Sequence, residues 1–235
     1  MKSIILKIER REGVVIPFEY NYYLGISLYS KLQEYQKEVK PLHTREQLGI
    51  HTISNIITKN PIKYGDNGLE IDGGFVIFRS LDPKIITYLR LGLSIDPIIR
   101  IANVKYYVKS IHDLEPKLKN ENIINFRTIS PILVRNFDIK KKFVNRIEDI
   151  EKNLNLSTRW ILEKEFGIKD PNINIEIKSA KRKTVKISSA KAKESITTAF
   201  QVNGKMSGDP NILQILYYKG LGSKTSLALG CWEVF

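Results

Sequence analysis

The spacing of apolar residues predicts alternating strands and helices from the start of the chain. Residues 3–10 alternate between apolar and polar side chains, as in a strand with one buried face. Leu24, Leu28 and Leu32 then recur at the spacing of an amphipathic helix. A proline suits the first turn of a helix and another proline follows the pattern, so we expect this helix over residues 17–39.

The same reasoning gives the order β-α-β-β-α-β to the first half of the chain and again to the second, which is the ferredoxin-like arrangement. In the first half, further strands are predicted over residues 50–58, 74–79 and 104–111, and a second helix over residues 82–91. In the second half, strands are predicted over residues 122–135, 172–179, 184–189, 196–207 and 229–235, and helices over residues 145–166 and 209–218. A basic turn is expected to join the strands 172–179 and 184–189.

A linker is predicted between the two halves, because Pro116 and several charged residues cluster at residues 115–121. We therefore expect an α+β protein with tandem ferredoxin-like (RRM-like) domains. The N-terminal domain is predicted over residues 1–117 and the C-terminal domain over residues 118–235.

The charge of the chain points to a polyanionic partner. Its 235 residues contain 38 Lys+Arg against 25 Asp+Glu, a formal net charge of +13. Nucleic acid is the simplest partner for such an excess, and the alternative is a merely basic soluble protein. The single cysteine, Cys231, excludes an internal disulfide and a cysteine zinc site. Without a signal peptide or an apolar run long enough to span a membrane, we expect a soluble cytoplasmic protein without membrane contact.

The C-terminal segment has the composition of a phosphate-binding loop. Gly220 and Gly222 allow the backbone to bend where a side chain would clash. Ser223, Lys224 and Thr225 then offer hydroxyls, a cation and backbone N–H groups to a phosphate. An apolar strand, rather than a helix, follows the loop, which excludes a P-loop and a dinucleotide-binding fingerprint.

This segment resembles the C-terminal glycine-rich loop of the CRISPR repeat-processing endoribonucleases of the RAMP superfamily. Gly220, Gly222 and Gly230 match the glycines of that loop, and Ala228 stands where the family usually has glycine. Residues 17–21, 28–29 and 42–43 resemble the family's first helix and the turn after it, and residues 207–213 resemble the approach to its last helix. The resemblance implies tandem ferredoxin-like domains and an RNA substrate.

The resemblance also implies catalytic residues in the N-terminal half. RNA is cut without metal when a base takes the 2′ proton, an acid protonates the 5′ oxygen and a cation stabilises the charged phosphate. His43 stands at the position of the family's catalytic histidine, and Tyr29 at that of its helical tyrosine. The family's lysine is replaced by Gly49, so Arg45 or His51 is the candidate third member.

Each candidate has a structural alternative: a loop histidine for His43, core packing for Tyr29, a solvated charge for Arg45 and a half-buried strand residue for His51. His112, beside an aspartate at a predicted strand end, is expected to be structural. We predict no metal and no cofactor, because none of the usual ligand motifs is present.

A basic run offers a second RNA contact. It consists of Lys178, Lys181, Arg182, Lys183, Lys186, Lys191 and Lys193. A hairpin carrying these side chains is suited to a nucleic-acid backbone, and the alternative is a solvated edge strand whose lysines prevent aggregation.

The sequence thus predicts a metal-independent endoribonuclease that cuts CRISPR repeat RNA (pre-crRNA) by 2′-OH attack and leaves guide crRNA with a 2′,3′-cyclic phosphate. The alternative is a non-catalytic RAMP protein that binds RNA within a CRISPR effector complex. Monomer and homodimer both remain open.

Overall fold

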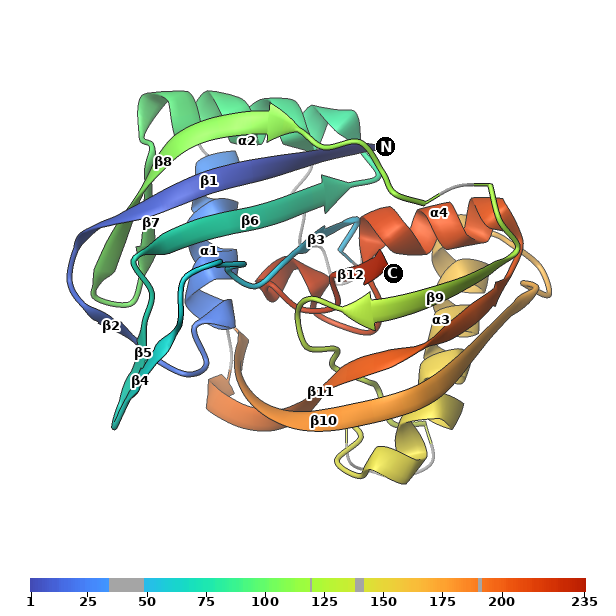
Figure 1. Cartoon of the computed structure of the whole chain (residues 1–235). Coiled ribbons are helices and arrows are strands. Elements are labelled where there is room, and N and C mark those ends of the chain that lie inside the picture. The colour runs from blue at the N-terminus through green and yellow to red at the C-terminus, as the bar shows by residue number, and fades with distance from the viewer. Residues whose placement is uncertain (34–48, 119, 138–141, 190–191) are drawn as a thin grey trace.

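Two antiparallel sheets, each with two helices against it, lie side by side (Figure 1). The computed structural model describes residues 1–33, 49–118, 120–137, 142–189 and 192–235. The C-terminal strand is an edge strand of the second sheet and lies near the middle of the molecule (Figure 1).

The first sheet has the strand order β3-β6-β1-β8-β7. Its elements are β1 (Lys2–Glu12), α1 (Asn21–Gln33), β3 (His51–Ile53), β6 (Gly73–Ser80), α2 (Pro83–Ile95), β7 (Ile98–Ile101) and β8 (Val104–Asp113). A small separate sheet is formed by β2 (Val15–Ile16), β4 (Lys63–Gly65) and β5 (Gly68–Glu70). The helix α2 begins where the sequence predicts. The Asp82 side chain caps the helix by accepting a hydrogen bond from the Lys84 amide, and Pro83 is its first residue.

The second sheet repeats that order as β10-β11-β9-β12. Its elements are β9 (Ile123–Thr128), η2 (Ile147–Asp149), α3 (Ile150–Phe166), β10 (Ile173–Ser189), β11 (Ala192–Gly208), α4 (Pro210–Lys219), η3 (Thr225–Leu227) and β12 (Trp232–Val234). In both sheets the first and third strands of the unit are central, which is the ferredoxin-like order.

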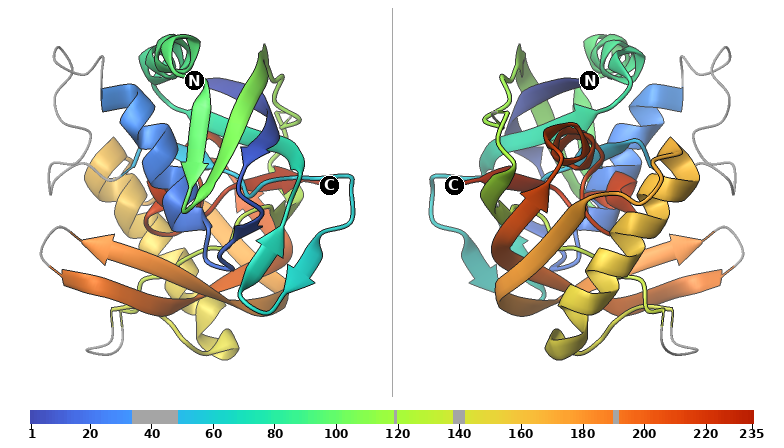
Figure 2. Two further views of the ribbon diagram at one scale, coloured as in Figure 1. Left: turned by 90° about the vertical axis from the view of Figure 1, so that its left-hand side faces the viewer. Right: turned by 90° about the vertical axis from the view of Figure 1, so that its right-hand side faces the viewer.

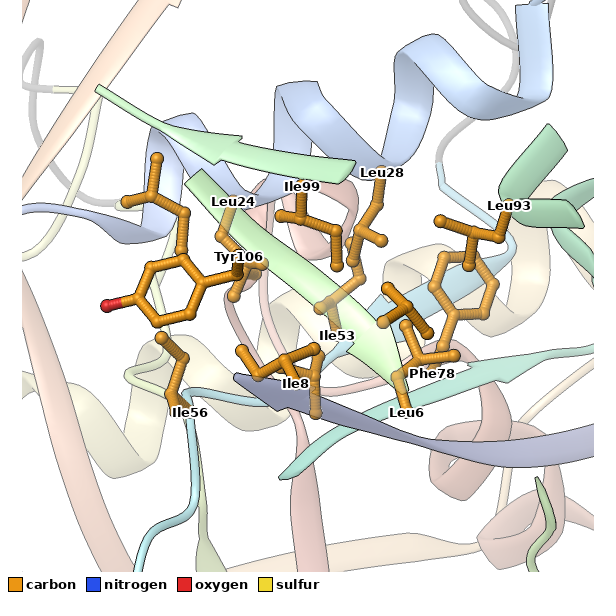
Figure 3. Packing of buried hydrophobic residues seen from close by; sticks show 14 of the residues in the cluster. Leu6, Ile8, Leu24, Leu28, Ile53, Ile56, Phe78, Leu93, Ile99 and Tyr106 are labelled. Carbon is orange, nitrogen blue, oxygen red and sulfur yellow. The ribbon is translucent and has the colours of Figure 1, made fainter. Parts of the chain in front are cut away.

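Alternating side chains of β1 pack beneath α1 and α2 in the first hydrophobic core (Figure 3). Leu6 and Ile8 of β1 face Leu24 and Leu28 of α1, with Phe78 of β6 filling the space beside them. A second core lies between α3, α4 and the second sheet, around Phe126, Phe200 and Trp232. Each sheet therefore has its own core. The boundary between residues 117 and 118 stays a prediction.

Two predictions of local structure are wrong, and four short strands were missed. The helix α1 begins at Asn21 and not at Pro17, which opens a turn closed by a hydrogen bond from the Tyr20 amide to the Pro17 carbonyl. The strands expected over residues 172–179 and 184–189 are one continuous strand, β10. The basic residues therefore lie on a strand rather than in a turn, because pairing with β11 outweighs the low strand propensity of lysine (Figure 2). The short strands β2, β4, β5 and β7 were not predicted.

Candidate functional site

The glycine-rich loop forms the joint between the two halves of the molecule. It contains residues in the left-handed region, with φ values of 87° at Gly220, 75° at Gly222, 60° at Lys224, 54° at Ala228 and 73° at Gly230. A side chain at any of the three matched glycines would also collide with neighbouring atoms. A Cβ on Gly230 would lie 2.1 Å from the Leu221 carbonyl oxygen, and one on Gly222 would lie 2.7 Å from the Leu133 carbonyl oxygen. Only glycine satisfies both constraints.

One face of α1 lies on this loop. The Asn21 side chain donates a 2.7 Å hydrogen bond to the Ala228 carbonyl. One turn later, a Cβ on Gly25 would be 2.6 Å from the Leu227 Cα, so helix and loop backbones touch. Residues four apart share a helix face, so Tyr29 is the next residue of the series Asn21, Gly25, Tyr29. Its ring is half-buried.

The strand β3 approaches the loop from the other side. A Cβ on Gly49 would lie 3.1 Å from the Thr225 hydroxyl, so the chain re-enters the described structure next to η3. The Thr52 hydroxyl donates to the Leu229 carbonyl at 3.0 Å, and Ile53 bridges Gly230 in parallel. Residues 34–48, which include His43 and Arg45, lie outside the described residues, but the chain before and after them belongs to elements packed on the loop.

A buried guanidinium completes the joint. Arg79 of β6 is 1% exposed and donates to the carbonyl of Trp232 in β12. Its Cζ atom lies 3.7 Å from the centroid of the Tyr217 ring, in a cation–π contact. The Arg79 guanidinium thus connects β6 of the first sheet to β12 and α4 of the second half.

Most of the loop is interior, which differs from the sequence-based expectation. Gly220, Gly222 and Thr225 are buried, because they pack against Thr52, Leu133 and Gly49 rather than facing solvent. Ser223 is half-buried and Lys224 is exposed, so these two are the predicted loop residues that remain open to a ligand. Partial burial and the nearby charge of Lys142 lower the pKa of Lys224.

The candidate histidine His51 is also interior. Its side chain is 2% exposed and stacks on Phe78, with ring centroids 5.1 Å apart. This position favours the structural alternative for His51, because a buried ring cannot contact RNA in this conformation. His112 is exposed, and its Nε2 lies 2.9 Å from the Ser110 hydroxyl.

The basic residues follow the edge strand β10. Lys178, Lys181, Arg182 and Lys183 are exposed along it. Lys186 differs, since it donates a 2.9 Å hydrogen bond to the Tyr23 hydroxyl and lies over that ring, 5.1 Å from its centroid. It thereby ties the hairpin to α1. Lys191 lies outside the described residues, as does the side chain of Lys193.

Two kinds of feature are absent from the described residues. Within the described ranges, no three His, Cys, Asp or Glu side chains come together in a way that could hold a metal ion. No helix in the described part of the chain has the length and apolar character needed to cross a bilayer. The first finding does not extend to His43.

The repeated strand order defines the class of fold: two ferredoxin-like folds in tandem, joined at the glycine-rich loop. Family comparison is more specific. The model for "CRISPR associated protein Cas6, C-terminal" matches residues 114–234, and the model for "CRISPR-associated protein Cas6, N-terminal" matches residues 15–112. The chain belongs to the Cas6 family.

Curated relatives and solved structures agree with this assignment. The chain is 25% identical to "CRISPR-associated endoribonuclease Cas6 1" of Methanocaldococcus jannaschii, over 97% of this chain and 90% of that protein. It is 27% identical to "CRISPR-associated endoribonuclease Cas6" of Pyrococcus furiosus, over 93% of this chain and 83% of that protein.

Among solved structures, "An RAMP protein binding different RNA substrates" matches with a TM-score of 0.84 at 22% identity, covering 100% of both chains. A Cas6-related protein from Pyrococcus furiosus matches with a TM-score of 0.83 at 23% identity, covering 100% of this chain and 98% of that one. The predicted fold class and family are therefore confirmed.

Sequence reasoning missed the residues that build the joint. Asn21, Gly25, Thr52 and Arg79 were not among the candidates. Gly25 carried a signal, because an isolated glycine inside a helical pattern usually has a packing reason. The other three are ordinary residues at positions set by tertiary structure, and nothing local distinguishes them.

Proposed function

We propose that this protein is an endoribonuclease that cuts CRISPR repeat RNA into guide crRNA without a metal ion. Membership of the Cas6 family supports the proposal, as do two relatives that are named CRISPR-associated endoribonucleases. The net charge of +13 suits a polyanionic substrate.

The observation that carries the proposal is the convergence of α1, β3 and the glycine-rich loop. Tyr29 belongs to the face of α1 that contacts the loop. Gly49, just before β3, lies beside Thr225 of the loop. The segment between these two elements contains His43 and Arg45. Lys224 is the exposed cation of the loop. A phenol and a cation thus belong to elements that meet at one joint, and the segment that contains His43 and Arg45 connects two of these elements in the sequence.

The proposed reaction is an internal transesterification. The 2′ oxygen attacks the adjacent phosphorus, the bond from phosphorus to the 5′ oxygen breaks, and a 2′,3′-cyclic phosphate forms. One proton leaves the 2′-OH and another is delivered to the 5′ oxygen. His43 takes one of these roles, since imidazole titrates near neutral pH, while Tyr29 orients the phosphate or donates to the leaving oxygen. Arg45 and Lys224 stabilise the additional negative charge.

The exposed cations of β10 are proposed to hold the RNA. Lys178, Lys181, Arg182 and Lys183 line the edge strand of the second sheet. They are long, exposed side chains, suited to phosphates in several positions. They would contribute affinity rather than chemistry.

Substitution of His43 by alanine tests the proposal. Cleavage of the repeat RNA from the CRISPR array of the same genome should fall by about 100-fold or more, the usual contribution of a general acid or base, while RNA affinity is retained. His112→Ala is the matched control, because it removes an exposed histidine of the first sheet and should leave the rate unchanged. Wild-type protein that binds the repeat but never cuts it would instead favour an RNA-binding subunit of a CRISPR effector complex.

A further inference from the structure

An arginine in cation–π contact with two aromatic rings lies on the surface of the second half. The Arg135 guanidinium lies 5.6 Å from the centroid of the Phe137 ring and 5.3 Å from that of the Trp160 ring. Phe137 is 40% exposed, Arg135 is exposed and Trp160 is half-buried. We name this set the aromatic platform. An exposed phenylalanine ring and a half-buried tryptophan ring thus meet at one guanidinium.

The platform is held in place by buried groups. The Phe137 amide donates a 2.9 Å hydrogen bond to the side-chain oxygen of Asn153 in α3, which is 1% exposed. The Asn153 side chain in turn donates to the Asp149 carbonyl. Trp160 lies two turns further along the same helix face. The backbone of Phe137 and the helix that carries Trp160 are therefore held together before any ligand arrives, which reduces the entropic cost of binding.

The platform is connected to the glycine-rich loop by a short extended segment. Leu133 bridges Ser223, and the Ser223 amide donates to the Leu133 carbonyl at 2.8 Å. Arg135 is two residues further along and bridges Phe143, so it lies about 7 Å from that anchor. Lys142 lies over the Phe143 ring. It is also close enough to Lys224 for its positive charge to lower the pKa of that amine. A line of cations thus runs from the loop to the platform.

We propose that the aromatic platform is a stacking site for an unpaired nucleotide of single-stranded RNA, separate from the cleavage site. Flat aromatic faces and an arginine plane are what single-stranded bases stack on, and flanking cations suit the phosphates beside them. The choice of RNA as the polymer rests on the proposed function. The line of Lys142 and Lys224 beside the patch matches a polyanion and favours RNA over a protein partner, because lysine is depleted at protein interfaces.

Intrinsic fluorescence gives a direct test. The chain has two tryptophans, and Trp232 is fully buried, so Trp160 is the one that a base can reach. A short oligoadenylate should quench its emission, whereas polyphosphate, which carries the charge without bases, should not. Equal quenching by polyphosphate, or no quenching by oligoadenylate, would overturn the proposal. Emission that depends on protein concentration alone would overturn it in favour of a protein interface.

Substitution separates stacking from general charge. Phe137→Ala should weaken oligoadenylate binding about tenfold, within the range found for a base stacked on an aromatic ring, and Phe137→Tyr should restore it. Phe235→Ala is the matched control, because Phe235 is an exposed ring beside Arg127, 6.0 Å away, and should change affinity less than twofold. Equal losses in the two alanine variants would overturn the proposal.

Cleavage is measured separately in the same samples. If the protein fails to cut repeat RNA but oligoadenylate still quenches Trp160 and Phe137→Ala still binds weakly, the proposed function fails and the platform stands. If repeat RNA is cut while Trp160 and Phe137 do not respond, the platform fails and the proposed function stands.

Discussion

The glycine-rich loop and the β10 strand were both expected to bind RNA, but the loop is mostly buried and the strand is exposed. Gly220, Gly222 and Thr225 are buried against the first half of the molecule, whereas Lys181 and Arg182 are exposed on an edge strand. Glycines with positive φ identify a place where something approaches the backbone closely. In this loop the approaching groups are α1, β3 and Leu133. The glycines therefore allow these segments to pack together, and they are not exposed to a ligand.

The largest expected effect is the loss of the joint. Gly230→Ala introduces a Cβ 2.1 Å from the Leu221 carbonyl oxygen at a φ of +73°. Left-handed strain and overpacking together should lower the free energy of unfolding by about 3 kcal/mol or more. Gly167→Ala is the matched control: it has a φ of +65° with nothing within 4 Å, so it should cost only about 1 kcal/mol. Denaturant melts of both variants measure this difference, and equal costs would contradict a tightly packed joint.

The exposed strand should respond in the opposite manner. Changing Lys181, Arg182 and Lys183 together to glutamine should weaken RNA binding by more than tenfold. In a plot of the logarithm of the binding constant against the logarithm of the salt concentration, the slope should become less negative by about 2. Each lost phosphate contact contributes about 0.7 to this slope.

The melting temperature should stay unchanged in that variant, since exposed substitutions alter stability by about 0.5 kcal/mol or less. Replacing Lys59, Lys63 and Lys84, which are exposed on the first half, removes the same charge. If this second triple variant weakens binding equally, net charge rather than the β10 surface holds the RNA.

A smaller effect is expected from Lys219, the residue before the loop. Burial lowers its pKa below the ordinary value of 10.5, and Glu165 opposes the shift. Between the lowered pKa and 10.5 the folded protein binds fewer protons than the unfolded chain, so the free energy of unfolding rises with pH in that window.

Lys219→Met should therefore raise stability below that window by about 1 kcal/mol and remove the alkaline rise. Urea melts across the alkaline range measure both quantities. Lys164→Met, at an exposed position of α3, should leave the pH profile intact. A wild-type profile without any alkaline rise would contradict the burial of a charged amine.

The smallest effect is expected at Ala228, where the loop departs from the family pattern. Its φ of 54° is left-handed, so glycine would relieve strain, but its fully buried methyl group packs in the first core. The two contributions nearly cancel, and Ala228→Gly should change the free energy of unfolding by no more than about 0.5 kcal/mol. A gain above about 1 kcal/mol would mean that the methyl group contributes nothing to packing.

The sequence was sufficient for the order of the main helices and strands and for the class of fold. Asp82-Pro83 and Asp209-Pro210 mark two helix starts correctly, because capping is a local interaction. The alternation in β1 and the spacing of Leu24 and Leu28 likewise reflect one buried face each. Local rules failed along β10, where lysines that favour a turn are held in a strand by pairing with β11.

Burial of the candidate residues could not be predicted from the sequence. His51 was weighed as a catalytic group, but its neighbour on the next strand is Phe78, and that pairing joins residues far apart in the chain. Thr52 and Leu229 meet only because the two halves dock. The predicted roles of His43 and Arg45 remain predictions, resting on the family resemblance and on the elements that flank them.

The most direct test of the central claim is cleavage of repeat RNA in EDTA, with the 2′-OH at the scissile position either present or replaced by hydrogen. The account predicts that the intact RNA is cut at an undiminished rate, that the product ends in a 2′,3′-cyclic phosphate, and that the 2′-deoxy substrate is bound but not cut. Cleavage of the deoxy substrate, or loss of cleavage in EDTA that added magnesium restores, would contradict it.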